Sequence, residues 1–97
     1  MRIAVAQIVS STDPESNLTL IAEHARPAAD AGAELVVFPE ATMASFATAS
    51  AGVAEPLDGP FAQRVREIAA ASGVTVALGM FTSADRLPRN TLLVTGP

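Results

Sequence analysis

The stretch ELVVFPEA, residues 34–41, decides how this chain of 97 residues is interpreted. The run from Leu35 to Phe38 has no polar alternation, which predicts a strand buried on both faces. Pro39 cannot donate to a strand ladder and holds its predecessor extended, so the strand is expected to end near Phe38. Glu40 then follows the carboxyl end of the strand, the edge at which open α/β sheets bind ligands. From this pattern alone, Glu40 is either a functional carboxylate or a cap of the next turn.

A strand and a helix are predicted before this stretch. Residues 2–8 form a nearly continuous apolar run and predict a first buried strand. Asp13 before Pro14 is a helix-start signal, and Gly32 suits a left-handed position just after the helix. Pro27 is expected to kink the helix or to make it restart. One apolar stripe runs along this helix: Leu18, Ile21, Ala22, Ala25 and Ala29.

A second helix, a third strand and a fourth strand are predicted after it. The helix begins at Pro60 and ends at Gly73. Its apolar stripe consists of Phe61, Val65, Ile68 and Ala69. Residues 74–80 predict a third buried strand, and residues 92–94 a fourth, antiparallel to the third because the connection is too short for a helical crossover. The order β-α-β-α-β-β predicts an α/β fold whose first three strands are parallel.

The segment 41–59 between the central strand and the second helix has no sustained period. A loop of this length in a compact domain is usually functional, so Met43 and Phe46 are candidates for lining a substrate pocket beside Glu40. The other interpretation is a short alanine-rich helical turn followed by a linker. Glu55 and Asp58 flank a turn that contains proline and glycine, and we expect both carboxylates to be solvated.

Composition excludes several functional classes. The net charge is −4 and there is no lysine, so no basic surface for nucleic acid is predicted. The absence of cysteine excludes disulfides and, within this segment, a thiol nucleophile. His24 is the only histidine and is expected to be solvated on an exterior helix; no metal or cofactor is predicted. No targeting or membrane-spanning segment is recognised, so a cytoplasmic location is the default.

Four stretches follow one another in a specific order: RIAVAQ, GAELVVFPEA, LDGPFAQRVREIAAASGVTVALGMF and RNTLLVTGP. Together they resemble the amino-terminal part of the nitrilase superfamily, the carbon-nitrogen hydrolases, over essentially the whole chain. The resemblance implies that residues 1–97 are the amino-terminal part of a single hydrolase domain, a partial α/β/β/α nitrilase-like sandwich. It also implies a homo-oligomer that pairs through a helical face.

The resemblance further implies a Glu-Lys-Cys triad. Glu40 matches the family's glutamate, and Asn90 matches the polar start of the next strand, as a supporting feature. The lysine and cysteine normally lie after the point that matches Pro97, and the chain contains neither, so the segment alone is expected to be inactive. A thiol with a pKa of about 8.5 needs a base, and a partly buried carboxylate walled by Phe38 would serve. The small residues of the loop favour a small amide over an aromatic nitrile as substrate.

Other interpretations remain. The chain could be a small, non-enzymatic α/β binding module in which Glu40 binds an amine or hydroxyl, or a degenerate structural subunit that pairs through its helices. A Rossmann nucleotide-binding domain is disfavoured, because the first turn, VSSTDPES, contains no glycine for a pyrophosphate to approach.

Overall fold

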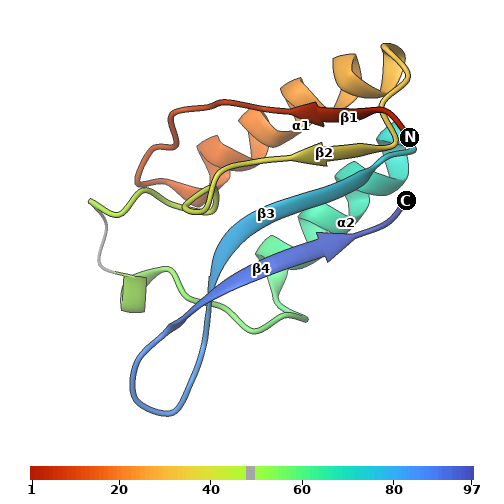
Figure 1. Cartoon of the computed structure of the whole chain (residues 1–97). Helices are drawn as coiled ribbons and strands as arrows, with labels where there is room; N and C mark the ends of the chain where they lie inside the picture. The colour runs from red at the N-terminus through yellow and green to blue at the C-terminus, as the bar shows by residue number, and fades with distance from the viewer. Residues whose placement is uncertain (48–49) are drawn as a thin grey trace.

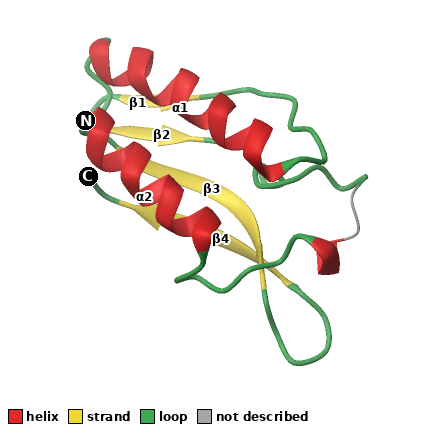
Figure 2. Ribbon diagram, turned by 180° about the vertical axis from the view of Figure 1, so that it is seen from behind, coloured by secondary structure: helices red, strands yellow, loops and turns green. Residues whose placement is uncertain are grey.

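One four-stranded sheet, with two helices against one of its faces, makes up the fold in the computed structural model, which describes residues 1–47 and 50–97 (Figures 1 and 2). The elements in chain order are β1 (Ile3–Val5), α1 (Pro14–Asp30), β2 (Leu35–Val37), the 3₁₀ helix η1 (Ser50–Gly52), α2 (Pro60–Ser72), β3 (Thr75–Thr82) and β4 (Arg89–Thr95). Neither α-helix in the described part of the chain is long and apolar enough to cross a membrane.

The sheet has the strand order β1-β2-β3-β4. The first three strands are parallel, because α1 and α2 each return the chain to the same end of the sheet, and β4 pairs with β3 as an antiparallel hairpin. Ala4, Val36 and Val76 are neighbours across the three parallel strands. The predicted order and strand directions are therefore confirmed.

The helix ends follow the predicted signals. The carboxylate of Asp13 accepts a hydrogen bond from the backbone N–H of Glu15 at the start of α1. After α1, Gly32 has a φ of +90°, a backbone conformation that costs glycine no steric strain. The N–H groups of Gly32 and Ala33 donate to the carbonyls of Ala29 and Ala28, the two bonds of a Schellman motif.

Pro27 does not make α1 restart, which corrects one alternative of the sequence-based expectation. The helix continues through it to Asp30, and the carbonyl of Pro27 accepts the N–H of Ala31 at 3.0 Å. A proline removes the hydrogen bond to the carbonyl four residues earlier, here that of Glu23. Both Glu23 and Pro27 are exposed, so water can satisfy the freed carbonyl, and only one turn of helix follows.

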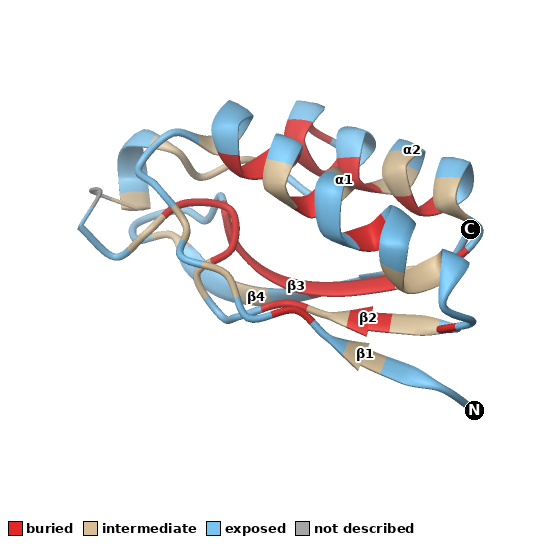
Figure 3. Ribbon diagram, turned by 90° about the horizontal axis from the view of Figure 1, so that it is seen from above, coloured by how far each residue is buried: buried red, intermediate tan, exposed pale blue. Residues whose placement is uncertain are grey.

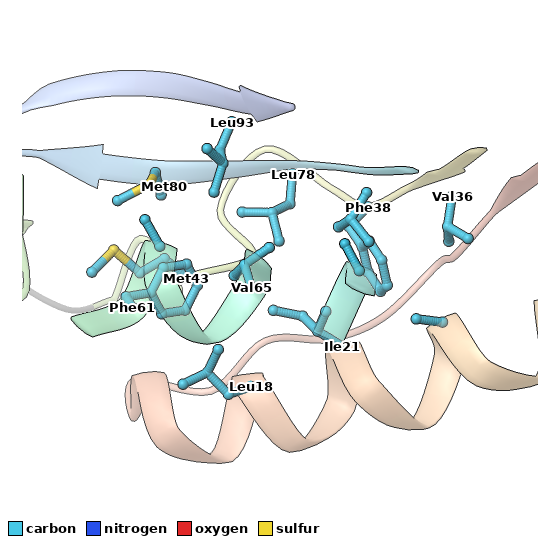
Figure 4. Packing of buried hydrophobic residues seen from close by; sticks show 14 of the residues in the cluster. Leu18, Ile21, Val36, Phe38, Met43, Phe61, Val65, Leu78, Met80 and Leu93 are labelled. Atoms are coloured by element: carbon cyan, nitrogen blue, oxygen red, sulfur yellow. The ribbon is translucent and has the colours of Figure 1, made fainter. Parts of the chain in front are cut away.

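The hydrophobic core lies between the helices and one face of the sheet (Figure 4). Both helices contribute the stripes that the sequence predicted, apart from Ala22, Ala29 and Ile68, which are half-buried. Strand residues that point toward the helices alternate with residues that do not, as the pleat requires. The sheet side of the core includes Val36, Val76, Leu78, Met80 and Leu93.

The other face of the sheet, which we call the open face, carries no helix and is exposed along its outer strands, whereas Ala77 and Phe81 of β3 are buried (Figure 3). The apolar residues of this face on the outer strands are all exposed: Ile3, Val5, Leu92 and Val94. The prediction that the strand from Leu35 is buried on both faces is therefore wrong for this chain: in β2 only Val36 is buried, and Leu35 and Val37 are half-buried. The first strand was predicted to be buried, but Ile3 and Val5 of β1 are exposed and Ala4 is half-buried. The reason is that both helices cover the same face.

Candidate active site

The chain does not leave the sheet when β2 ends. Residues 38–43 continue alongside β3 and exchange backbone hydrogen bonds with it. These bonds are Phe38 N–H to Ala77 O at 2.8 Å, Gly79 N–H to Pro39 O at 3.2 Å and Met43 N–H to Gly79 O at 3.1 Å. The segment between the second and third of these bonds is a tight turn that carries Glu40, and the hydroxyl of Thr42 closes it by donating to Pro39 O at 2.6 Å.

Gly79 provides the space for this turn. A Cβ atom built on Gly79 would lie 1.3 Å from the carbonyl oxygen of Glu40 and 2.2 Å from its carbonyl carbon. These distances are far inside van der Waals contact, so any side chain at this position would displace the turn. Gly79 alternates with the buried Leu78 and Met80, so the turn rests on the open face. Glu40 therefore lies over β3 on that face, rather than simply beyond the end of β2.

The side chain of Glu40 reaches Asn90 on the neighbouring strand. The Nδ2 atom of Asn90 donates a short hydrogen bond to Oε1 of Glu40. Asn90 pairs with Phe81 across the hairpin and lies on the open face, two residues before Leu92. In the described part of the chain, no other side chain forms a hydrogen bond or ion pair with the Glu40 carboxylate. The second oxygen, Oε2, is thus without a protein partner among residues 1–47 and 50–97.

A hollow of about 340 Å³ borders the carboxylate. It is lined by Phe38, Glu40, Gly79, Asn90, Thr91 and Leu92. Phe38 supplies an apolar wall, as predicted, but the residue Glu40 is exposed, which corrects the expectation of a partly buried acid. The reason is again that the site lies on the open face, which no element of the described chain covers.

Met43 and Phe46 do not line this hollow. Met43 is completely buried in the core, where its sulfur accepts the N–H of Phe81 at 3.4 Å. The side chain of Phe46 is exposed and packs edge-on against the ring of Phe81. Within the 41–59 segment the structure has the short helix η1, and Thr48 and Ala49 lie outside the described residues. A role of either side chain in binding substrate stays a prediction.

The remaining candidates have structural roles or are solvated. Oε1 of Glu55 accepts the N–H of Phe61 at 2.7 Å, which satisfies a free amide at the start of α2. This corrects the expectation that Glu55 is only solvated. Asp58 and His24 are exposed, as expected. The His24 ring does contact Phe38 edge-on, with 6.5 Å between the ring centroids.

Asn17 is a buried polar residue that the sequence reasoning missed. Its side-chain amide donates to the carbonyls of Ser11 and Met43, both at 2.9 Å, and its Oδ1 accepts the N–H of Ser11 at 2.8 Å. It therefore joins α1 to the segment that follows Glu40. The available signal was its position four residues before Ile21, which places a polar residue on the apolar stripe.

A family model described as carbon-nitrogen hydrolase matches residues 2–97. The chain belongs to this family. Two relatives from Mycobacterium tuberculosis, Hydrolase Rv0480c and Hydrolase MT0498, are each 55% identical to it over 98 residues. Each match covers 100% of this chain and 35% of the relative. The family resemblance inferred from the sequence is confirmed, and the chain spans about a third of the length of these curated relatives.

Solved structures of the same superfamily share the fold. XC1258 from Xanthomonas campestris, a CN-hydrolase superfamily protein, is 26% identical with a TM-score of 0.84, and the match covers 100% of this chain and 37% of that one. An amidase from Nesterenkonia sp. is 27% identical with a TM-score of 0.79, covering 97% of this chain and 37% of that one. The nitrilase-type α/β fold is therefore confirmed, with only part of each neighbour's chain represented.

Proposed function

We propose that this chain supplies the general base of an amide hydrolase of the carbon-nitrogen hydrolase family, and that the base is Glu40. The observation that carries the proposal is the carboxylate of Glu40, held by Asn90 at the rim of a hollow, in a chain that matches the family over residues 2–97. The lysine and cysteine of the family's triad would come from polypeptide outside these 97 residues.

The proposed reaction begins with proton transfer to Glu40. The thiol of the cysteine gives its proton to the carboxylate and its sulfur attacks the amide carbonyl carbon. The carbon-nitrogen bond then breaks, and the proton on Glu40 passes to the departing nitrogen. Water attacks the resulting thioester, and its proton returns through Glu40 to the thiol. The lysine would stabilise the oxyanion, a contribution of about 3 kcal/mol for one well-placed donor.

The open face supports the view that residues 1–97 are one part of a larger domain. In an α/β/β/α sandwich the two sheets face each other, and this chain contains one helix layer and one sheet layer. The apolar side chains of the open face and the Glu40 turn would then be covered by the second sheet and its loops. That cover would also reduce the exposure of Glu40.

A small amide is the substrate class that we propose. Mutants of the Nesterenkonia amidase have been solved in complex with acrylamide, and with the acetamide moiety of fluoroacetamide added at the active-site cysteine. The loop after Glu40 is rich in alanine, serine and threonine, a composition that favours a small amide over an aromatic nitrile. A cytoplasmic location and a homo-oligomeric state stay predictions.

The proposal is tested by replacing Glu40→Gln in the longer protein that contains this chain. Ammonia release from acetamide, propionamide and acrylamide is measured for the wild type and the variant. We expect kcat to fall by about 10²- to 10⁴-fold with an unchanged fold, because the amide cannot accept the thiol proton. A wild type that releases no ammonia from any of these amides, or a variant with wild-type kcat, would contradict the proposal.

The second candidate is a non-enzymatic binding module, which the exposed carboxylate beside a hollow also suits. In that case the 97 residues alone would bind a small amine such as methylammonium, and Glu40→Gln would abolish the binding. Under our proposal the 97 residues alone neither hydrolyse amides nor bind the amine measurably. Calorimetric titration of this chain separates the two.

A further inference from the structure

We infer that Asn90 is a positioning residue for the Glu40 base, and this inference rests on the proposed function of Glu40. Its amide group would hold one carboxylate oxygen and leave the other to take the proton. The β3–β4 hairpin would thus hold Glu40 at two points, its backbone over Gly79 and its side chain at Asn90.

The strand geometry places the Asn90 amide on the correct side of the sheet. Asn90, Leu92 and Val94 alternate with the buried Leu93, so their side chains share the open face with the Glu40 turn. Asn90 lies near the start of β4, where its partner across the hairpin is Phe81, two residues beyond Gly79. The backbone of Glu40 lies over Gly79, and its side chain extends from there toward Asn90.

The contact with Asn90 gives the two carboxylate oxygens of Glu40 different roles. An amide NH₂ group can only donate, so the Asn90 Nδ2 atom occupies a lone pair of Oε1 and does not compete for protons as a second acid would. Oε2 keeps its lone pairs free of the described residues. A glutamate otherwise has three rotatable side-chain bonds, and one fixed oxygen restricts them before substrate arrives.

A purely structural role explains Asn90 poorly. Asparagine is depleted in strands, whereas the β-branched residues of the same strand, Thr91, Val94 and Thr95, are of the types enriched there. Within these 97 residues both Asn90 and Glu40 are exposed, so water can replace their hydrogen bond at little cost to the stability of this part of the fold. An unfavourable residue that makes an exposed contact to the proposed base is better explained by orientation of that base.

The test is a double-mutant cycle in the longer protein, with acetamide as substrate. Asn90→Ala is expected to lower kcat by about 10- to 100-fold with less than about a threefold change in KM, because the lost bond orients the base and does not bind substrate. In the Glu40→Gln background the same substitution is expected to change kcat by less than about twofold, since its effect acts through the missing base.

Asn90→Asp distinguishes a positioning role from a purely structural one, because only the positioning role predicts a loss of kcat with an unchanged melting temperature. Aspartate has the shape of asparagine but, as a carboxylate, cannot donate to Glu40 and repels it. We expect a loss of kcat at neutral pH at least as large as for Asn90→Ala, with an unchanged melting temperature. Val94→Ala, which removes a side chain from the same face of β4, is the matched control and is expected to retain kcat.

Each result decides between the two hypotheses. Wild-type kcat in Glu40→Gln overturns the proposed function and the inference with it. A large loss in Glu40→Gln together with wild-type kcat in Asn90→Ala or Asn90→Asp overturns only the inference. So does an Asn90→Ala effect that is fully retained in the Glu40→Gln background, because the asparagine would then act independently of the base.

Discussion

The two faces of the sheet have similar side chains but different surroundings. On the helix-covered face, Leu93 is 6% exposed, whereas its neighbour Leu92, on the open face, is 68% exposed. The covered face is closed by α1 and α2, which are the crossovers between the parallel strands and so lie close in sequence to the strands that they cover. The open face carries the Glu40 turn and its hollow. The comparison teaches that the crossovers complete the fold, whereas the candidate site lies on the face that they leave uncovered.

The largest expected effect is that of Gly79→Ala, which pushes the Glu40 turn away from β3. The added Cβ overlaps the Glu40 carbonyl, and the two hydrogen bonds between Gly79 and the turn would be lost. We expect a loss of about 3 to 5 kcal/mol in the free energy of unfolding, from overpacking and two lost hydrogen bonds. Urea unfolding measures it.

A matched substitution shows whether the Gly79 effect is local. Gly52→Ala introduces the same methyl group where, apart from its chain neighbours, no atom of residues 1–47 and 50–97 lies within 4 Å of the new Cβ. It is expected to change the free energy of unfolding by less than about 0.5 kcal/mol. Equal effects of the two substitutions would show that close approach of the Glu40 turn is not what Gly79 provides.

Leu93→Ala probes the covered face and is expected to have the second-largest effect. Removing this buried side chain from β4 should cost about 2 to 3 kcal/mol, near the lower end for leucine because β4 is an edge strand of this sheet. The midpoint of urea unfolding is the measurement. A cost below about 0.5 kcal/mol would mean that the helices do not pack on β4 as described.

Leu92→Ala is the same change one residue earlier, on the open face, and has the smallest expected effect. In the chain of 97 residues it should change the free energy of unfolding by less than about 0.5 kcal/mol, because the side chain is already in water. In the longer protein that we propose, the cost should rise to about 2 kcal/mol as a second sheet covers this residue. An equal small effect in both chains would contradict a covered open face.

Much of the fold could be predicted from local patterns. Gly32 and Gly73 have positive φ angles where the two apolar stripes end, and Asp13 caps α1, because these roles depend only on neighbouring residues. The burial of β1 and β2 was predicted less well. A run such as LVVF reports that a strand is apolar, but the number of faces that become covered depends on where the helices and any further chain pack.

In the candidate site, too, some features follow from neighbouring residues and others from tertiary packing. Pro39 indicated that Glu40 follows a strand end, and the family resemblance assigned it a role. The contact with Asn90 joins residues 50 positions apart, and the clearance at Gly79 depends on strand register, so neither follows from spacing along the chain. The placing of Met43 in the core was missed for the same reason, since a long loop gives no period from which to infer its buried side chains.

The sequence by itself determined the order of strands and helices, the helix ends and the position of one acid, Glu40, just after a strand, because backbone preferences and apolar periodicity act over a few residues. Only the tertiary structure decided that the acid rests over a glycine of β3, is held by an amide of β4 and lies on the face without helices. Those features depend on which strands become neighbours and in what register, and that is settled by packing of the whole sheet.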